Sequence, residues 1–102
     1  MKPPVPLGRR LQLDSGDTGV EIYWFDANGF ARAILGESDG PQCAPVFRYR
    51  VLSVDSLELI GAEGPIDTWT GIRIEGDALQ VDSKGRLKTF FIGQEADKES
   101  TP

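Results

Sequence analysis

Apolar residues alternate with polar ones along most of this chain, and short glycine-containing segments interrupt the alternation. A period of two puts successive side chains on opposite faces of a β-strand, whereas a helix needs a period near 3.6. The 12 glycines and 7 prolines add turn-forming residues between the alternating runs. The pattern therefore predicts an all-β protein of short strands and tight turns, without a long helix.

The stretch GIRIEGDALQV gives the cleanest hairpin signal. Gly76-Asp77 suits a two-residue turn of the primed types. This turn sets Ile74 opposite Leu79, and the apolar side chains of the hairpin then share one face, as a half-buried hairpin requires.

The next hairpin, VDSKGRLKTF, predicts a three-residue loop, Ser83-Lys84-Gly85, whose final glycine occupies the left-handed position. This register sets Val81 opposite Leu87 and Leu79 opposite Thr89. It also keeps the inner face of the preceding hairpin unchanged.

The stretch FRYRVLSVDSLELI fits only one register. A two-residue turn sets Val51 against Glu58, which mixes polar and apolar faces, so a three-residue turn at Ser53–Asp55 is expected. The resulting pairs are Val51 with Leu57, Tyr49 with Leu59, and Arg50 with Glu58.

A fourth hairpin, VEIYWFDANGFARAIL, turns at Asn28-Gly29, the strongest short hairpin signal. Its register stays open, because a two-residue or a three-residue loop leaves apolar groups on both faces. The aromatic residues either are covered on both faces or are presented to a ligand or partner.

Strands are expected near 10–14, 20–26, 30–36, 46–52, 56–60, 69–75, 78–82 and 86–92. Seven to eight such strands, paired consecutively, form an antiparallel up-and-down meander that curls into a barrel or half-barrel to protect its edges. We expect an extended proline-rich arm at residues 1–8, one barrel domain at 9–93 and a disordered polar tail at 94–102.

Three stretches, FDANGFARA, YRVLSVDSLEL and IRIEGDALQVDSKGRLKTFF, resemble the small bacterial lipocalin-like domains of the calycin type. The shared motifs are an aromatic-x-x-x-Gly-aromatic hairpin at Phe25–Phe30, a tyrosine-led strand into x-Leu-x-Leu at Tyr49–Leu59, and an Ile-x-Gly-Asp-x-Leu-x-Val hairpin at Ile74–Val81. The resemblance covers roughly residues 20 to 92 and implies an up-and-down lipocalin-like barrel. The Gly-x-Trp opening and the late arginine of that family have no counterpart here. The resemblance brings no catalytic constellation.

The chain contains no histidine and one cysteine, Cys43. This removes histidine-based catalysis and a thiolate metal site, so no catalytic residue, metal or cofactor is expected and the protein is predicted not to be an enzyme. The net charge of −5 argues against a nucleic-acid partner and suits a basic protein partner. The sequence shows neither a secretory signal nor a membrane span, which predicts a cytoplasmic protein.

The candidate binding residues are aromatic. They act either as a ligand wall or partner hot spot, or as core packing, and Trp69 either plugs the barrel or anchors a partner. Strand arginines lie beside acidic residues at Arg32, Arg48, Arg50 and Arg73. They either line an anion site, if some of them face inward, or form the solvated face of the sheet, which is the more common arrangement. The candidate residues are Tyr23, Trp24, Phe25, Phe30, Tyr49 and Trp69.

The leading functional hypothesis is a non-catalytic protein-interaction module of the inhibitor or immunity type, with a protein partner. The alternative is a lipocalin-like carrier of a small apolar ligand, and a third option is a domain that assembles oligomers through an edge strand. The carrier hypothesis predicts a cavity lined by Tyr49, Leu57, Leu59, Ile72, Ile74 and Phe91.

Overall fold

The computed structural model describes residues 3–14, 19–37 and 40–95, in which short connections join consecutive β-strands. Alternating residues form strands because each strand can bury one face while its other face meets water. The described strands are β1 (Arg9–Leu13), β2 (Gly19–Phe25), β3 (Phe30–Glu37), β4 (Gln42–Cys43), β5 (Val46–Ser53), β6 (Ser56–Gly61), β7 (Gly64–Glu75), β8 (Ala78–Ser83) and β9 (Arg86–Glu95).

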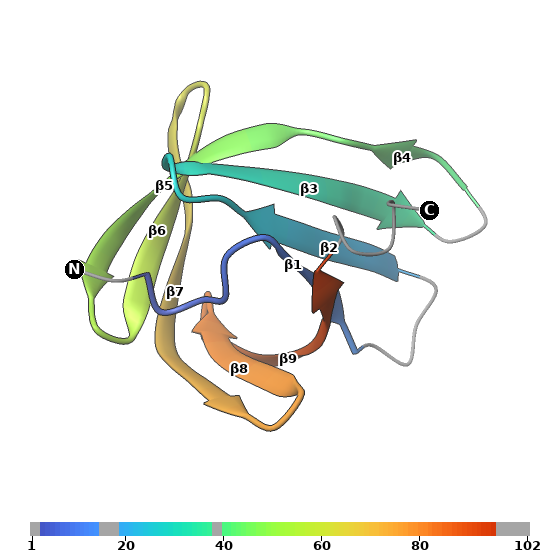
Figure 1. Cartoon of the computed structure of the whole chain (residues 1–102). Helices are drawn as coiled ribbons and strands as arrows, with labels where there is room; N and C mark the ends of the chain where they lie inside the picture. Colours follow the sequence, from blue (N-terminus) through green and yellow to red (C-terminus); the bar gives the residue numbers. More distant parts are fainter. Residues whose placement is uncertain (1–2, 15–18, 38–39, 96–102) are drawn as a thin grey trace.

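The sheet closes into a barrel because β1 pairs with two strands from opposite ends of the chain. It lies antiparallel to β2 on one side and to β9 on the other, and β2–β3, β3–β5 and the later neighbours complete the ring (Figure 1). Eight strands form this closed antiparallel barrel, and β4 is an additional strand on β3. The predicted all-β meander is confirmed in its barrel form, and β4 is the strand that the sequence pattern did not predict.

Two hairpins have the predicted registers, because only one alignment in each separates polar from apolar side chains. The turn of the β5–β6 hairpin differs from the predicted three-residue turn, because Ser53 lies opposite Ser56 and the loop has two residues, Val54 and Asp55. A register shift between Val51 and Ser53 reconciles this shorter loop with the predicted pairs. A β-bulge at Gly71, where φ is 59°, interrupts the β7–β8 ladder between Thr70 and Arg73. The confirmed pairs are Tyr49 with Leu59, Arg50 with Glu58, Val51 with Leu57, Ile74 with Leu79, and Arg73 with Gln80.

The predicted register of the β8–β9 hairpin was wrong by one residue. Its loop has two residues, Lys84 and Gly85, with φ of 53° and 79°, as a type I′ turn requires. Ser83 therefore lies opposite Arg86. A three-residue loop also ends on a left-handed glycine, so the glycine alone does not distinguish the two turns.

This one-residue difference decides which of two neighbouring phenylalanines enters the core. Phe90 lies opposite Leu79 and is fully buried, whereas Phe91 is 51% exposed on the outside. Phe91 and Ile74, predicted to line a ligand cavity, are both about half exposed. That part of the cavity prediction was wrong.

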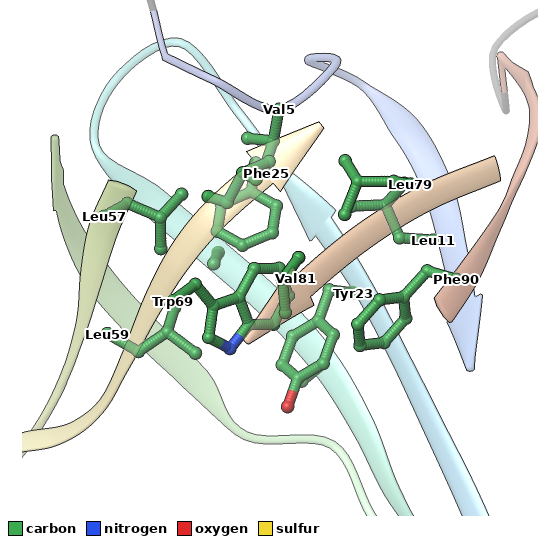
Figure 2. Close-up of a cluster of buried hydrophobic side chains, with 13 residues drawn as sticks. Val5, Leu11, Tyr23, Phe25, Leu57, Leu59, Trp69, Leu79, Val81 and Phe90 are labelled. Atoms are coloured by element: carbon green, nitrogen blue, oxygen red, sulfur yellow. The ribbon is translucent and has the colours of Figure 1, made fainter. Parts of the chain in front are cut away.

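Aromatic rings fill the barrel interior around Trp69. The Trp69 ring stacks on Phe90 with centroids 5.2 Å apart and meets Tyr23 edge-on at 5.1 Å. Such offset and edge-on pairs add to the free energy gained by burying the rings. The buried cluster, most of which is labelled in Figure 2, comprises Val5, Leu11, Tyr23, Phe25, Ala31, Ala33, Leu57, Leu59, Trp69, Ile72, Leu79, Val81 and Phe90.

The register of the β2–β3 hairpin, which the sequence left open, follows from a loop at residues 27–29. The Asp26 N–H donates to the Phe30 carbonyl across this loop, at 3.0 Å. Gly29 has a φ of 92°, and the Asp26 carboxylate accepts hydrogen bonds from the Asn28 and Phe30 N–H groups. A side-chain oxygen thus caps the turn, a role that Asp often takes.

The N-terminal arm covers one end of the barrel. Val5 is buried in the core cluster, and Leu7 forms a parallel bridge with Phe25. The Gly8 N–H donates to the Phe25 carbonyl at 2.8 Å. At the other terminus β9 continues to Glu95, and residues 96–102, most of the predicted tail, lie outside the described residues.

Candidate functional site

The predicted aromatic run on β2 is divided between the two faces of the sheet. Tyr23 and Phe25 point into the barrel and are buried, whereas Trp24 lies on the outer face. The residues across from the two inner rings are Ala33 and Ala31. These small side chains leave the interior space that the rings occupy.

The other predicted binding residues are also divided between the core and the outer face. Trp69 is fully buried, and Tyr49 packs against the core with its hydroxyl donating to the Asp26 carbonyl. Phe30 faces outward and is 39% exposed. Of the six candidates, four therefore pack in or against the core, and Trp24 and Phe30 share the outer face.

We call the outer surface formed by Trp24, Phe30, Arg32, Val46 and Arg48 the arginine–aromatic face. Arg32 lies between Trp24 and Val46 in the register, and its guanidinium sits 5.6 Å from the Trp24 ring centroid. Arg48 lies opposite Phe30, with its guanidinium 5.8 Å from that ring. Cation–π contacts of this length hold guanidinium groups over the rings, at exposed sites by about 0.5–1 kcal/mol.

The charges on this face are only partly compensated. Arg50, on the same outer face, pairs with Glu58 at 2.9 Å. Within residues 3–14, 19–37 and 40–95, no carboxylate lies within ion-pair distance of Arg32 or Arg48. The face therefore offers two guanidinium groups and two aromatic rings on a chain whose net charge is −5.

A polar network occupies the barrel end away from Val5. Figure 2 shows the Tyr23 hydroxyl and the Trp69 indole nitrogen pointing away from Val5. The Tyr23 hydroxyl donates to Glu21 Oε1 at 2.9 Å, and Lys88 Nζ donates to the same oxygen at 2.9 Å. Glu21 and Lys88 are largely buried, with side chains 17% and 25% exposed.

The second half of this network centres on Asp67. Its Oδ2 accepts from Trp69 Nε1 at 3.1 Å and from Ser83 Oγ at 2.6 Å. Its Oδ1 accepts the Thr68 N–H at 2.9 Å. These donors fix the carboxylate at the barrel end, and Trp69 gains the partner that a buried indole N–H needs.

Burial and this network together keep Tyr23 protonated. Burial raises the pKa of Tyr23 well above its ordinary value, and the charges of Glu21 and Asp67 with the hydrogen bond to Glu21 raise it further. Burial, with a smaller effect of Asp26, also raises the pKa of Tyr49. Tyr23 therefore stays a neutral hydrogen-bond donor at ordinary pH.

Two hollows open at this barrel end, and Glu21 and Lys88 line both of them. One measures about 260 Å³ and is lined by Glu21, Asp67, Lys84 and Lys88 with Tyr23 and an apolar wall of Leu35, Phe47, Leu59 and Ile66. The other measures about 410 Å³ and is lined by Leu13, Asp14, Glu21, Arg86, Leu87, Lys88 and Thr89. We call this region the polar end.

Comparison with family models, with curated proteins and with solved structures found no match to this chain. The closed eight-stranded antiparallel barrel is compatible with a lipocalin-like fold.

Sequence reasoning missed Glu21, Asp67, Ser83 and Lys88 as members of one site. Alternation gave a usable signal, since Glu21 and Asp67 each precede an inward-facing aromatic residue by two positions, which puts them on the same face. Their partners lie far away in sequence, however, with 67 positions between Glu21 and Lys88.

The described part of the chain holds no group of three or more His, Cys, Asp or Glu residues placed to bind a metal ion. Cys43 is exposed and unpaired on β4. None of the described residues belongs to a helix long and apolar enough to cross a membrane.

Proposed function

We propose that this protein is a non-catalytic binding module whose arginine–aromatic face docks an acidic segment of a protein partner. The observation that carries the proposal is the pairing of Trp24 and Phe30 with two guanidinium groups that have no carboxylate partner among the described residues. Trp and Arg are enriched among the residues that dominate protein–protein binding energies.

The shape of the face suits a protein segment. Phe30 and Val46, 39% and 62% exposed, give apolar contact area between the two arginines. Guanidinium groups that are already stacked on rings lose less freedom when they bind a carboxylate, and they can bind it through two N–H groups. The net charge of −5 favours basic partners at long range, but the contact chemistry of this face favours acidic side chains.

The test is a peptide display screen against the immobilised protein. We expect enrichment of segments that combine Asp or Glu with an apolar residue. A double variant, Arg32→Glu with Arg48→Glu, should weaken the selected peptides at least about tenfold. Arg73→Glu with Arg86→Glu is the control, because it makes the same change in net charge elsewhere.

Several outcomes would refute this proposal. One is a selected peptide that binds both double variants equally well, and another is a screen without acidic enrichment. Tighter binding of a single-stranded oligonucleotide than of any peptide would assign the face to nucleic acid instead. For an inhibitor or immunity-type role, the captured partner must also lose its own activity when it binds the wild-type protein and keep it with the Arg32/Arg48 variant.

We also propose that the barrel is of the calycin type. The up-and-down strand order and the Phe25–Phe30 and Ile74–Val81 hairpins support this assignment. A crystal structure whose strand tilt and stagger differ from those of calycin barrels would refute it. The alternative role as a carrier of an apolar ligand has less support, because aromatic side chains fill the interior.

A further inference from the structure

We infer that the smaller hollow at the polar end is a binding site for a small organic ammonium ion that carries a compact apolar group. This site is separate from the arginine–aromatic face and does not depend on the function proposed there. Its volume of about 260 Å³ lies near the lower limit of about 300 Å³ for small-molecule sites, which restricts the ligand to a few heavy atoms.

The charge pattern of the hollow selects a cation. The Lys88 ammonium is neutralised by Glu21, to which it donates at 2.9 and 3.2 Å. No lysine or arginine of the described residues pairs with the Asp67 carboxylate. The rim residue Lys84 is exposed on its turn, where its long side chain can turn into solvent. The fixed, half-buried charge that remains is therefore the negative charge of Asp67.

Asp67 also has room for another donor. A carboxylate offers about four lone-pair positions, and three donors, from Thr68, Trp69 and Ser83, occupy Asp67. Only one of these three reaches Oδ1. An ammonium group could donate to this oxygen without displacing an existing hydrogen bond.

The opposite wall accounts for the apolar part of the ligand. Leu35, Phe47 and Ile66 line the hollow on its apolar side, and Ile66 is exposed. A short branched or aromatic group placed there would bury its own surface and part of Ile66 at once. A site that joins an anchored carboxylate to an apolar wall matches a molecule with an ammonium at one end and a hydrocarbon group at the other.

The test uses 3-methylbutylamine as the probe and the two indole N–H signals in a nitrogen–proton correlation spectrum as the readout. The Trp69 signal should shift saturably, because its Nε1 donates to Asp67, while the Trp24 signal from the outer face should stay still. Affinity on the order of 1 mM is expected for so few atoms. The neutral alcohol and the carboxylate of matched shape should bind at least about tenfold more weakly.

Two variants separate the site from the fold. Asp67→Asn should weaken the amine at least about tenfold, and Glu58→Gln, which removes a carboxylate from the outer face, should leave the affinity unchanged. Because Asp67 also supports the core, Ile66→Lys provides a second test. Ile66 is exposed, so the variant should keep the wild-type spectrum and lose the amine through charge repulsion.

The inference is overturned if the amine produces no saturable shift of the Trp69 signal. It is equally overturned if the matched carboxylate binds as tightly as the amine, which would assign the hollow to anions held by its lysines. Amine binding that survives both Asp67→Asn and Ile66→Lys would place the ligand elsewhere.

Discussion

Phe90 and Phe91 are neighbours in sequence, yet their replacement by alanine should have very different effects. Phe90 is fully buried and stacks on Trp69 at 5.2 Å, whereas Phe91 is 51% exposed on the outer face. A buried phenylalanine removes about 200 Å² from water, which at about 25 cal/mol per Å² gives an upper limit of about 5 kcal/mol. Phe90→Ala is therefore expected to lower the free energy of unfolding by about 3–5 kcal/mol.

Phe91→Ala should lower the free energy of unfolding by about 1–2 kcal/mol, because half of the Phe91 side chain is already in water and its removal leaves no closed cavity. Urea unfolding followed by far-ultraviolet circular dichroism measures both changes. A domain of this size has a stability of only about 5–15 kcal/mol, so Phe90→Ala can leave too little folded protein to measure. Phe90→Leu and Phe91→Leu then make the same comparison, with expected costs of about 1–2 and under about 0.5 kcal/mol.

The comparison tests the register of the β8–β9 hairpin directly. With the Lys84-Gly85 turn, Phe90 faces inward, whereas a three-residue loop turns Phe91 inward instead. Equal costs at the two positions, or a larger cost at Phe91, would refute the register and the core packing that follows from it.

Changes at Lys84, Val5 and Tyr23 test a turn, the N-terminal arm and a buried hydroxyl. Lys84→Asn should stabilise the protein by about 0.5–1 kcal/mol relative to Lys84→Ala in urea unfolding, because asparagine tolerates the φ of 53°. An Asn variant that is less stable than the Ala variant would contradict the type I′ turn. Val5→Ala should lower the free energy of unfolding by about 1.5–2 kcal/mol. Val54→Ala, at a position 80% exposed, should lower it by under about 0.5 kcal/mol. Equal losses in urea unfolding would mean that the N-terminal arm does not pack in the core. Because burial raises the pKa of Tyr23, its contribution to stability is complete below pH about 10 and is lost as the pH rises toward the raised value. Wild-type protein should then lose more stability than Tyr23→Phe between pH about 9 and about 11, and equal losses would contradict the burial of the hydroxyl.

The sequence predicted the β5–β6 register because only one alignment kept its faces unmixed. Placing Arg50 beside Glu58 left Val51 with Leu57, and any shift by one mixed charges with apolar residues. The same reasoning identified the barrel class, since a closed ring is the usual way in which consecutive hairpins protect their edges.

The sequence identified the aromatic candidates, but it did not predict which of them lie in the core and which lie on the surface. The inward direction of Tyr23 and Phe25 depends on Ala33 and Ala31 across the hairpin, and the sequence left that register open. A loop at 27–29, capped by the Asp26 carboxylate, fixes it. Turn geometry thus decided which aromatic rings reach solvent.

The prediction of the β8–β9 register was wrong because both possible alignments of the hairpin bury apolar side chains. One register places Leu87 and Phe91 inside, and the other places Lys88 and Phe90 inside, so each buries apolar residues and leaves others exposed. A lysine inside a barrel is unfavourable unless a partner compensates for its desolvation. That partner is Glu21, on a strand that is separated from β9 by β1 in the closed sheet.

The ion pair therefore links the fold to the polar end. A slip of one residue in β9 would move Lys88 to the outside, leave Glu21 half-buried without its cation, and bring Leu87 toward the barrel end where Lys88 now lies. Breaking such a pair by removing one partner is strongly destabilising, by about 3–5 kcal/mol where the pair is fully buried. The same choice of register that puts Phe90 against Trp69 thus neutralises Lys88, and it leaves Asp67 as the unpaired charge that the proposed amine site requires.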